Sequence, residues 1–358
     1  MRIAVAGALA AKPHNGGEAW VRLSYVLGFR RLGADVVLLE ELDAASPEAI
    51  GWFRAIADRY GIPATLVDPS GCVVDGPAVN DADALVNVSG NLRAPRLLHR
   101  FARRAYVDLD PCFTQMWHAT GAVSLDGHHV YFTVGENVGT RRSIVPTGGL
   151  RWRATRPPVV LADWPELART RFDRFTTVST WRPGHGSVVV GGEAVGLRVH
   201  AFRRLADLPR RTSLPFEAAL AIDPAEASDL ESLRAGGWRL VPPDAVAGDP
   251  EAFRTYVRGS GAEFSVAQEA YTATRTGWLS DRTARYLACG RPALVSDTGN
   301  TAVPTGRGLV TFSSPDEARD AAQALVADYE THCAAARSLA VEYFDSDVVL
   351  TRLLEDLL

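Results

Sequence analysis

Short apolar stretches alternate with amphipathic ones along most of this chain, and that alternation restricts the fold more than any other feature. Arg2–Gly7 and Asp35–Glu40 have the composition of buried strands, and Glu18–Leu32 between them has apolar residues at helical spacing. Strands that alternate with helices favour a parallel sheet with crossover helices. The alternation weakens over Gly184–Ser213, which is rich in Gly, Arg and Pro, and resumes at Phe216–Ile222. The pattern therefore predicts two α/β units.

At 358 residues the chain is longer than a single hydrophobic core usually supports. We expect two Rossmann-like, doubly wound domains that face each other across a cleft. Residues 1–200 are predicted to form the first domain, 201–214 a linker, 215–330 the second domain, and 331–358 a helical segment that could pack on either domain. Ligands of such sheets bind at the carboxyl ends of the strands, so functional residues are expected in the loops that follow strands.

Composition and charge narrow the class of protein. The chain has 38 basic and 42 acidic residues, and this net charge of −4 gives no basic footprint, so we expect no nucleic-acid partner. No apolar run is long enough to cross a membrane, and the first residues resemble a buried strand more than a signal peptide, so a cytoplasmic location is expected. The four cysteines form no CxxC pair, which argues against a disulfide framework or a zinc site.

The loop after the first predicted strand holds the first candidate residues. Gly16 and Gly17 come directly before a helix, where a backbone without side chains can approach an anion and the free N–H groups favour phosphate. Lys12, the only lysine of the chain, and His14 precede them. His14 could accept a proton from a hydroxyl or donate to a phosphate, which makes it a candidate catalytic residue. The alternatives are a simple turn and ordinary surface residues.

A second set of candidates lies between the strand predicted at Glu263–Ala267 and a following helix. Ser280 or Asp281 can cap this helix, and its N-terminus would receive a second phosphate. Arg275 and Arg282 are suited to that phosphate because a guanidinium binds it bidentately. The alternatives are a cap without ligand contact for Asp281 and a solvated first-turn residue for Arg282.

The run Tyr286–Gly299, with the sequence YLACGRPALVSDTG, resembles the ACG-x-P-V-V-x-S-D-x-G signature of GT-B glycosyltransferases. Within that fold it is most similar to the large retaining set called glycosyltransferase family 4, or glycosyl transferases group 1. Gly16-Gly17 resembles the glycine pair of that set that contacts the donor phosphate, Thr176–Ser179 its T-V-S strand closing the first domain, and Gly306–Val310 its G-x-G-L-L-V strand. The resemblance implies an acceptor-side first domain and a donor-side second domain.

The chain departs from that family at one motif. The family carries two glutamates eight positions apart before the ACG-x-P run, one near the donor sugar and one on the ribose hydroxyls. Aligned on Gly290, those positions are Gly277 and Arg285 in this sequence. Asp281 or Glu269 could replace one of the two carboxylates.

Two further groups follow predicted strands. Asp108 and Asp110 form a DxD triplet, but a metal site of that kind belongs to a one-domain fold, so we expect no metal. Asp110 is instead a candidate base or a ligand for an acceptor hydroxyl, with a turn-capping residue before proline as the alternative. Glu136 and Asn137, flanked by glycines, are candidates for acceptor contact, although a structural turn explains them equally.

Together these features predict a hexosyltransferase-like enzyme that moves a sugar from a nucleotide-diphosphate sugar to an unidentified acceptor, without metal and without another cofactor. Positive groups and helix N-termini would stabilise the leaving diphosphate. A nucleotide-sugar epimerase of the same fold and a non-catalytic two-lobed binding protein are the alternatives.

Overall fold

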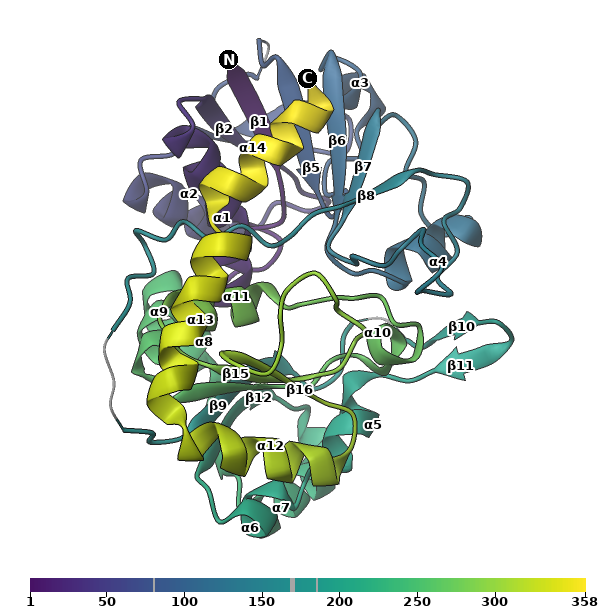
Figure 1. Ribbon diagram of the computed structural model, residues 1–358. Coiled ribbons are helices and arrows are strands. Elements are labelled where there is room, and N and C mark those ends of the chain that lie inside the picture. The colour runs from purple at the N-terminus through teal and green to yellow at the C-terminus, as the bar shows by residue number, and fades with distance from the viewer. Residues whose placement is uncertain (80, 168–170, 185) are drawn as a thin grey trace.

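The computed structural model describes residues 1–79, 81–167, 171–184 and 186–358. Two α/β units are stacked one above the other, each built on a mostly parallel sheet (Figure 1). This confirms the predicted fold class of two Rossmann-like domains.

The first domain contains an eight-stranded sheet in the order β4-β3-β2-β1-β5-β6-β7-β8. All neighbouring strands are parallel except β3 and β4. Its strands are β1 (Arg2–Ala6), β2 (Asp35–Glu41), β3 (Ala64–Val67), β4 (Val73–Asp75), β5 (Ala84–Val88), β6 (Arg103–Asp108), β7 (Val130–Thr133) and β8 (Trp152–Ala154), and its helices are α1 (Gly16–Arg31), α2 (Pro47–Arg59), α3 (Pro95–Leu98) and α4 (Phe113–Ala119).

The apolar composition of β1 explains why this strand lies in the middle of a parallel sheet. It is buried from Ile3 to Ala6, and Ile3 lies between Val36 of β2 and Ala84 of β5. Strands that are covered on both faces are continuously apolar, as parallel strands between helices usually are. The carboxyl ends of β1, β5 and β6 consequently lead into loops at one edge of the sheet.

The second domain contains a six-stranded parallel sheet in the order β13-β12-β9-β14-β15-β16. Its strands are β9 (Phe175–Thr180), β12 (Phe216–Ala221), β13 (Arg239–Leu240), β14 (Ala262–Ser265), β15 (Ala293–Ser296) and β16 (Leu309–Phe312). Its helices are α5 (Arg198–Arg203), α6 (Leu208–Thr212), the 3₁₀ helix η1 (Pro224–Glu226), α7 (Ala227–Ala235), α8 (Pro243–Ala247), α9 (Pro250–Gly259), α10 (Glu269–Ala273) and α11 (Asp281–Ala288).

The strand β9 corrects the expected domain boundary. The sequence predicted that this strand closes the first domain, whereas β9 pairs with β12 from Phe175↔Phe216 to Thr180↔Ala221 in the second sheet. The chain therefore changes domain between β8 and β9. Residues 201–214 were expected to form a linker between the domains. They instead belong to the connection from β9 to β12 within the second domain, which contains α5 and α6. Sheet membership depends on distant pairing partners, which local composition does not specify.

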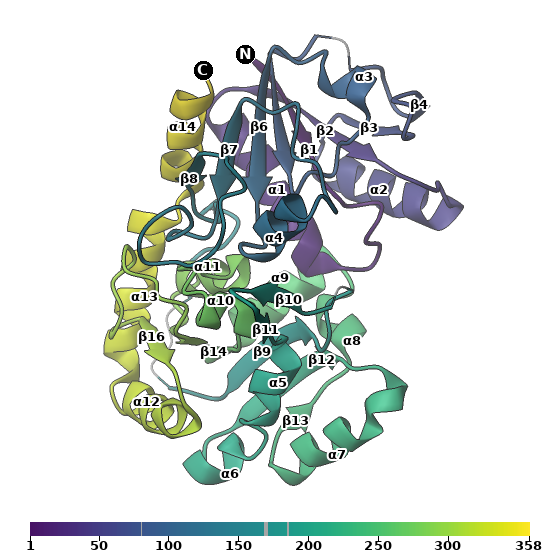
Figure 2. The ribbon, with the colours of Figure 1, turned by 90° about the vertical axis from the view of Figure 1, so that its right-hand side faces the viewer.

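A hairpin interrupts that same crossover. It consists of β10 (Val188–Val190) and β11 (Glu193–Val195), which are antiparallel. Figure 2 shows the hairpin beneath α4 of the first domain, and β10 and α4 are in contact. This inserted element explains the weak periodicity of the stretch in which it lies.

Three helices end the chain: α12 (Pro315–Ala327), α13 (Tyr329–Tyr343) and α14 (Ser346–Leu357). α13 packs on α11 of the second domain, and α14 packs on α1 of the first domain (Figure 1). A Cβ on Gly28 of α1 would lie 2.4 Å from Leu350 Cδ1, so α14 approaches α1 closely. The C-terminal segment thus joins both domains. Within the described parts of the chain, no helix has both the length and the apolar character to cross a membrane.

Candidate active site

A cleft of about 630 Å³ separates the two domains. Many of its lining residues lie in loops and helix starts that follow parallel strands, as expected for doubly wound sheets, and the others lie in strand ends or further along helices. The first domain contributes Lys12, His14, Asn15, Gly17, Glu18, Val21, Arg22, Ser89, Asn91, Leu109 and Asp110. The second contributes Val178, Ser179, Thr180, Pro183, Gly184, Arg198, Ala221, Pro243, Asp244, Ala247, Phe253, Gln268, Tyr271, Trp278, Ser280, Asp281 and Arg282.

The two glycines at the start of α1 have different surroundings. Asn15 caps the helix by accepting a hydrogen bond from the Glu18 amide at 3.1 Å. Gly17 lines the cleft, and a Cβ there would meet no atom closer than 3.6 Å. Gly16 does not line the cleft, because a Cβ there would lie 2.1 Å from the Asp249 carbonyl oxygen of the second domain. Gly16 allows the close approach of the two domains, and only Gly17 is placed to meet a ligand.

Lys12 and Arg22 share the carboxylate of Glu18 on the first-domain wall. Lys12 Nζ lies 2.8 Å from Glu18 Oε1, and Arg22 pairs with Glu18 Oε2. Burial alone would raise the pKa of Glu18, but the charges of Arg22 and Lys12 outweigh it and hold that pKa at about 2. The carboxylate is therefore ionised and is held by two cationic side chains.

His14 lies at the rim of the cleft. Its φ of 56° is in the left-handed region, and its side chain is 62% exposed. Nε2 is 3.1 Å from Glu48 Oε1, and the imidazole packs on Trp52 with ring centroids 5.1 Å apart. The ring is thus held toward α2, not toward the centre of the cleft.

Asp110 lies inside the cleft, opposite the second domain. The hydroxyl of Tyr271 donates to Asp110 Oδ1 at 3.0 Å. Its neighbour Asp108 is fully buried and accepts hydrogen bonds from the Asp110 amide and from Thr114, Gln115 and Thr133. Asp108 is therefore a structural anchor, and the DxD triplet places a single carboxylate in the cleft. No group of three potential metal ligands occurs among the residues that the structure describes.

Arg282 and Ser280 form the start of α11, which points at the cleft. Ser280 Oγ accepts from the Arg282 amide at 3.2 Å and caps the helix. The Arg282 guanidinium donates to the buried Glu263 at 2.6 Å, to Ser265 Oγ at 2.9 Å and to the Val178 carbonyl. Burial raises the pKa of Glu263, which the charge of Arg282 opposes. Arg282 reaches the cleft, but its first role is to neutralise a buried carboxylate.

Asp281 and Arg285 replace the arrangement expected from the family motif. Asp281 lines the cleft and forms an ion pair with Arg285 one turn later. Arg285 is 1% exposed and also donates to Ser24 Oγ of α1 at 3.3 Å. Gly277 has a φ of 75°, and a Cβ there would lie 3.1 Å from Asn137 Nδ2. The two family glutamate positions are thus occupied by a buried interdomain arginine and by a turn glycine against the other domain.

Arg198 is a cleft residue that the sequence analysis missed. It donates to the Val266 carbonyl at 2.9 Å, to the Thr180 carbonyl at 3.3 Å and to Ser179 Oγ. No ion pair joins it to a carboxylate of the described chain. Burial lowers the pKa of Arg198 to about 10, and the neighbouring charge of Arg282 adds to that effect. Arg198 is partly exposed in the cleft and forms no ion pair within the described chain, so it is suited to an anionic ligand. Only its position at the start of a helix, after a glycine-rich stretch, could have indicated it.

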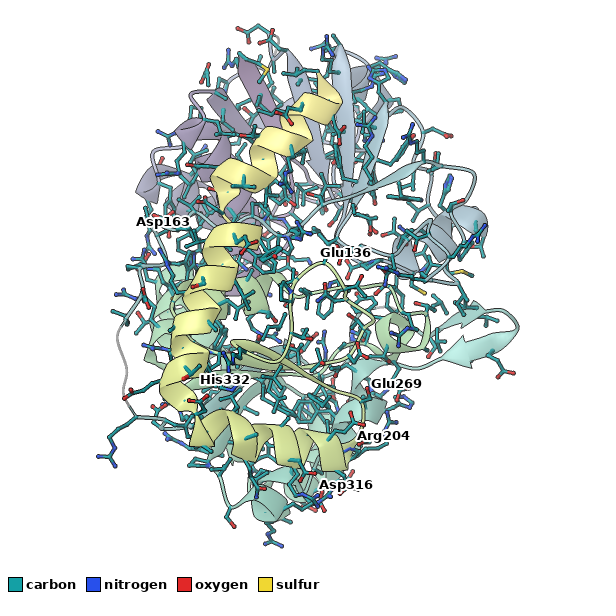
Figure 3. All side chains as sticks on the ribbon, in the orientation of Figure 1. Glu136, Asp163, Arg204, Glu269, Asp316 and His332 are labelled. Atoms are coloured by element: carbon teal, nitrogen blue, oxygen red, sulfur yellow. The ribbon has the colours of Figure 1, made fainter. Side chains whose placement is uncertain are left out.

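Arg275, Glu136 and Asn137 lie outside the cleft. Arg275 is 58% exposed, with Nη1 3.9 Å from Asp297. Asn137 Nδ2 donates to the carbonyl oxygens of Arg275 and Gly299, each at 2.9 Å. Glu136, labelled in Figure 3, pairs with Arg156 at 3.4 Å and accepts from the Ala302 amide at 3.3 Å. The structure places these predicted residues where a loop of the first domain contacts the second domain.

Two Rossmann-like domains with a ligand cleft at their facing strand ends define the GT-B fold. Comparison with solved structures agrees, although the sequence identities are low. An α-glucosyltransferase in complex with UDP-glucose and DNA containing an abasic site is 12% identical over 100% of this chain and 99% of its own, with a TM-score of 0.62. AviGT4, a glycosyltransferase involved in avilamycin A biosynthesis, is 15% identical over 99% and 96%, with a TM-score of 0.60. Anabaena Alr3699/HepE, in complex with UDP and glucose, is 11% identical over 100% and 99%, with a TM-score of 0.57.

No protein-family profile matches the chain, and no curated protein is significantly similar in sequence. The fold is therefore established by structure alone.

The same comparison corrects the expectation that nucleic acid is excluded as a partner. Four similar structures of α-glucosyltransferases are complexes with DNA, so a chain of this fold can bind it. The expectation failed because net charge averages over the whole surface. Residues 93–156 carry ten arginines against four acidic residues, although the chain as a whole is acidic.

Proposed function

We propose that this protein transfers a sugar from a nucleotide-diphosphate sugar to an acceptor hydroxyl in the interdomain cleft. The observation that carries the proposal is the pair Arg198 and Arg282 beside the N-terminus of α11, because Arg198 forms no ion pair with a carboxylate in the described chain. A diphosphate would bring negative charge to this pair, and both guanidinium groups and the helix N–H groups would stabilise it as it leaves. The similar structures with UDP or UDP-glucose bound support this assignment.

The roles of the two walls follow from their side chains. On the second domain, Arg198, Arg282 and the N-terminus of α11 would hold the diphosphate, and Trp278 offers an aromatic surface to the sugar. On the first domain, Gly17 would approach the diphosphate, and Asp110 would accept the proton of the acceptor hydroxyl. The transfer is proposed to need no metal, because cationic side chains would stabilise the negative charge of the leaving diphosphate.

We propose an anionic acceptor as the first class to test, with nucleic acid as its first member. The arginine-rich segment 93–156 of the first domain and the DNA complexes of similar structures support this choice. Cationic side chains would position such an acceptor through its phosphates.

Thermal shift with UDP, GDP, ADP and TDP, with and without EDTA, tests the donor site. A matching nucleotide in large excess should add about 2–4 kcal/mol of stability, unchanged by EDTA. Arg198→Ala should weaken that binding by about 1.5–3 kcal/mol, because a charge-assisted contact is lost. Arg204→Ala is the matched control, since Arg204 is 60% exposed and pairs with Glu269 outside the cleft (Figure 3).

Turnover of the corresponding nucleotide sugars then separates the alternatives. Release of the nucleoside diphosphate, increased by duplex DNA, supports transfer to nucleic acid. Interconversion of the sugar without release of the nucleoside diphosphate indicates an epimerase. Binding of the nucleotide sugar without either reaction indicates a binding protein. Absence of any nucleotide binding would reject the proposed function.

A further inference from the structure

A hydrogen bond joins two lining residues of the cleft that belong to different domains. Asp110 follows β6 in the first domain, and Tyr271 belongs to α10 in the second. The Tyr271 hydroxyl donates to Asp110 Oδ1 at 3.0 Å. Tyr271 is 2% exposed and is fixed between two aromatic rings, Phe113 at 5.8 Å and Trp278 at 4.7 Å between centroids. A rigid donor of one domain thus meets an exposed carboxylate of the other.

The rest of Asp110 is held from the opposite side. Its backbone amide donates to Asp108 Oδ1 at 2.9 Å, and Asp108 is itself fixed by Thr114, Gln115 and Thr133. The Asp110 carboxylate makes no second hydrogen bond or ion pair within the described chain, so Oδ2 remains open to the cleft. The backbone is therefore set by the first domain, and the direction of the carboxylate is set by Tyr271.

We propose that Tyr271 is a positioning residue for Asp110, so that the group that accepts the acceptor proton is assembled only where the two domains meet. This inference rests on the proposed function. In the reaction, the acceptor oxygen forms a bond to the anomeric carbon while the bond from that carbon to the diphosphate breaks and the diphosphate leaves with the electron pair. The acceptor proton passes to Asp110 Oδ2, which later releases it to water.

The neighbouring charges are consistent with this geometry. The titratable groups that face Asp110 are Asp108 and Tyr106 on β6, Tyr271 on α10 and Arg198 on α5. Burial, and then the charge of Asp110, raise the pKa of Tyr271 well above its ordinary value, so the phenol keeps the proton that it donates.

The test is Tyr271→Phe, which removes only the hydroxyl. Using the nucleotide sugar that wild-type protein turns over, we expect turnover to fall roughly 10- to 100-fold, because a misplacement of about 1 Å can cost 10² in rate. The loss should appear in kcat and not in the KM for the nucleotide sugar, because the hydroxyl positions the base and does not hold the donor. Affinity for the nucleoside diphosphate should stay within about twofold. Tyr256→Phe is the control, because Tyr256 is a buried tyrosine of the same domain that does not line the cleft.

Asp110→Asn completes a double-mutant cycle and keeps the proposal testable if Tyr271→Phe folds poorly, since Asp110 is exposed. Tyr271→Phe should have no further effect in the Asp110→Asn background. A loss that appears in KM and not in kcat, or equal losses in both backgrounds, would overturn the inference while the proposed function stands. A wild-type protein that binds no nucleotide and turns over no nucleotide sugar would reject both.

Discussion

Adjacent glycines at the start of α1 provide a sharp test of the structure, because Gly16 and Gly17 should respond in opposite ways to the same substitution. In Gly16→Ala the new Cβ would lie 2.1 Å from the carbonyl oxygen and 2.4 Å from the carbonyl carbon of Asp249. Both are backbone atoms, so no side chain can rotate away. The start of α9 is also anchored there, since Trp20 Nε1 donates to the Pro250 carbonyl at 2.8 Å.

The magnitude follows from this geometry. Relief of the contact requires α1 and α9 to separate by roughly 1 Å, and overpacking of this kind costs about 1–3 kcal/mol. For domains of this size each kcal/mol lowers the melting temperature by roughly 2–4 °C. Gly17→Ala meets nothing closer than 3.6 Å and gains up to about 1 kcal/mol of helix propensity, so its melting temperature should be unchanged or higher. Because Gly17 lines the cleft, its added methyl should instead weaken nucleotide binding.

Differential scanning fluorimetry of both variants, followed by calorimetric titration with the preferred nucleoside diphosphate, measures the two effects separately. A Gly16→Ala variant as stable as wild type would refute the packing argument. Equal loss of nucleotide affinity in both variants at unchanged stability would show that the pair contacts phosphate as a unit, as the sequence alone predicted.

Three further outcomes are expected. Arg282→Ala should lower the free energy of unfolding, measured with denaturant, by about 3–5 kcal/mol, because it leaves the buried carboxylate of Glu263 unpaired. A free energy of unfolding within about 1 kcal/mol of wild type would show that Arg282 serves only to bind the ligand. As pH falls from 4.5 toward about 2, protonation of Glu18 should remove the stability of its ion pairs, so the melting temperature should fall through this window, and less so in Glu18→Gln. His14→Ala should change turnover less than about tenfold, whereas Asp110→Asn should reduce it about 10²- to 10⁴-fold; steady-state kinetics showing the reverse order would make His14 the base.

The fold class could be predicted from the sequence because the spacing of apolar residues and their burial are local properties. Continuously apolar strands such as β1, followed by helices such as α1, allow few arrangements other than doubly wound sheets. The position of β9 was not predictable in the same way, because its partners β12 and β14 lie far along the chain. The hairpin of β10 and β11 within the following crossover further obscured the pattern.

The candidate site was predicted in part for a related reason. Residues that directly follow strands or open helices, such as Gly17, Asp110 and Ser280, do line the cleft. Arg275 and Asn137 satisfied the same rule, yet they lie at the interdomain contact, because a loop has two sides and sequence does not say which one faces the ligand. Arg198 was missed because its environment is made by three backbone and hydroxyl oxygens of distant segments.

Lys12 gives the cleft a chemical property that no other side chain of the sequence shares. It is the only lysine in the chain, its side chain is 46% exposed, and it lines the cleft beside Glu18. Apart from the α-amine of Met1, amine-directed acylation can therefore modify only one group, and that side chain lies between the domains. A fluorophore attached in this way would report on occupancy and opening of the cleft in the natural sequence, and protection of this amine by a bound molecule would identify ligands without any assay of the reaction.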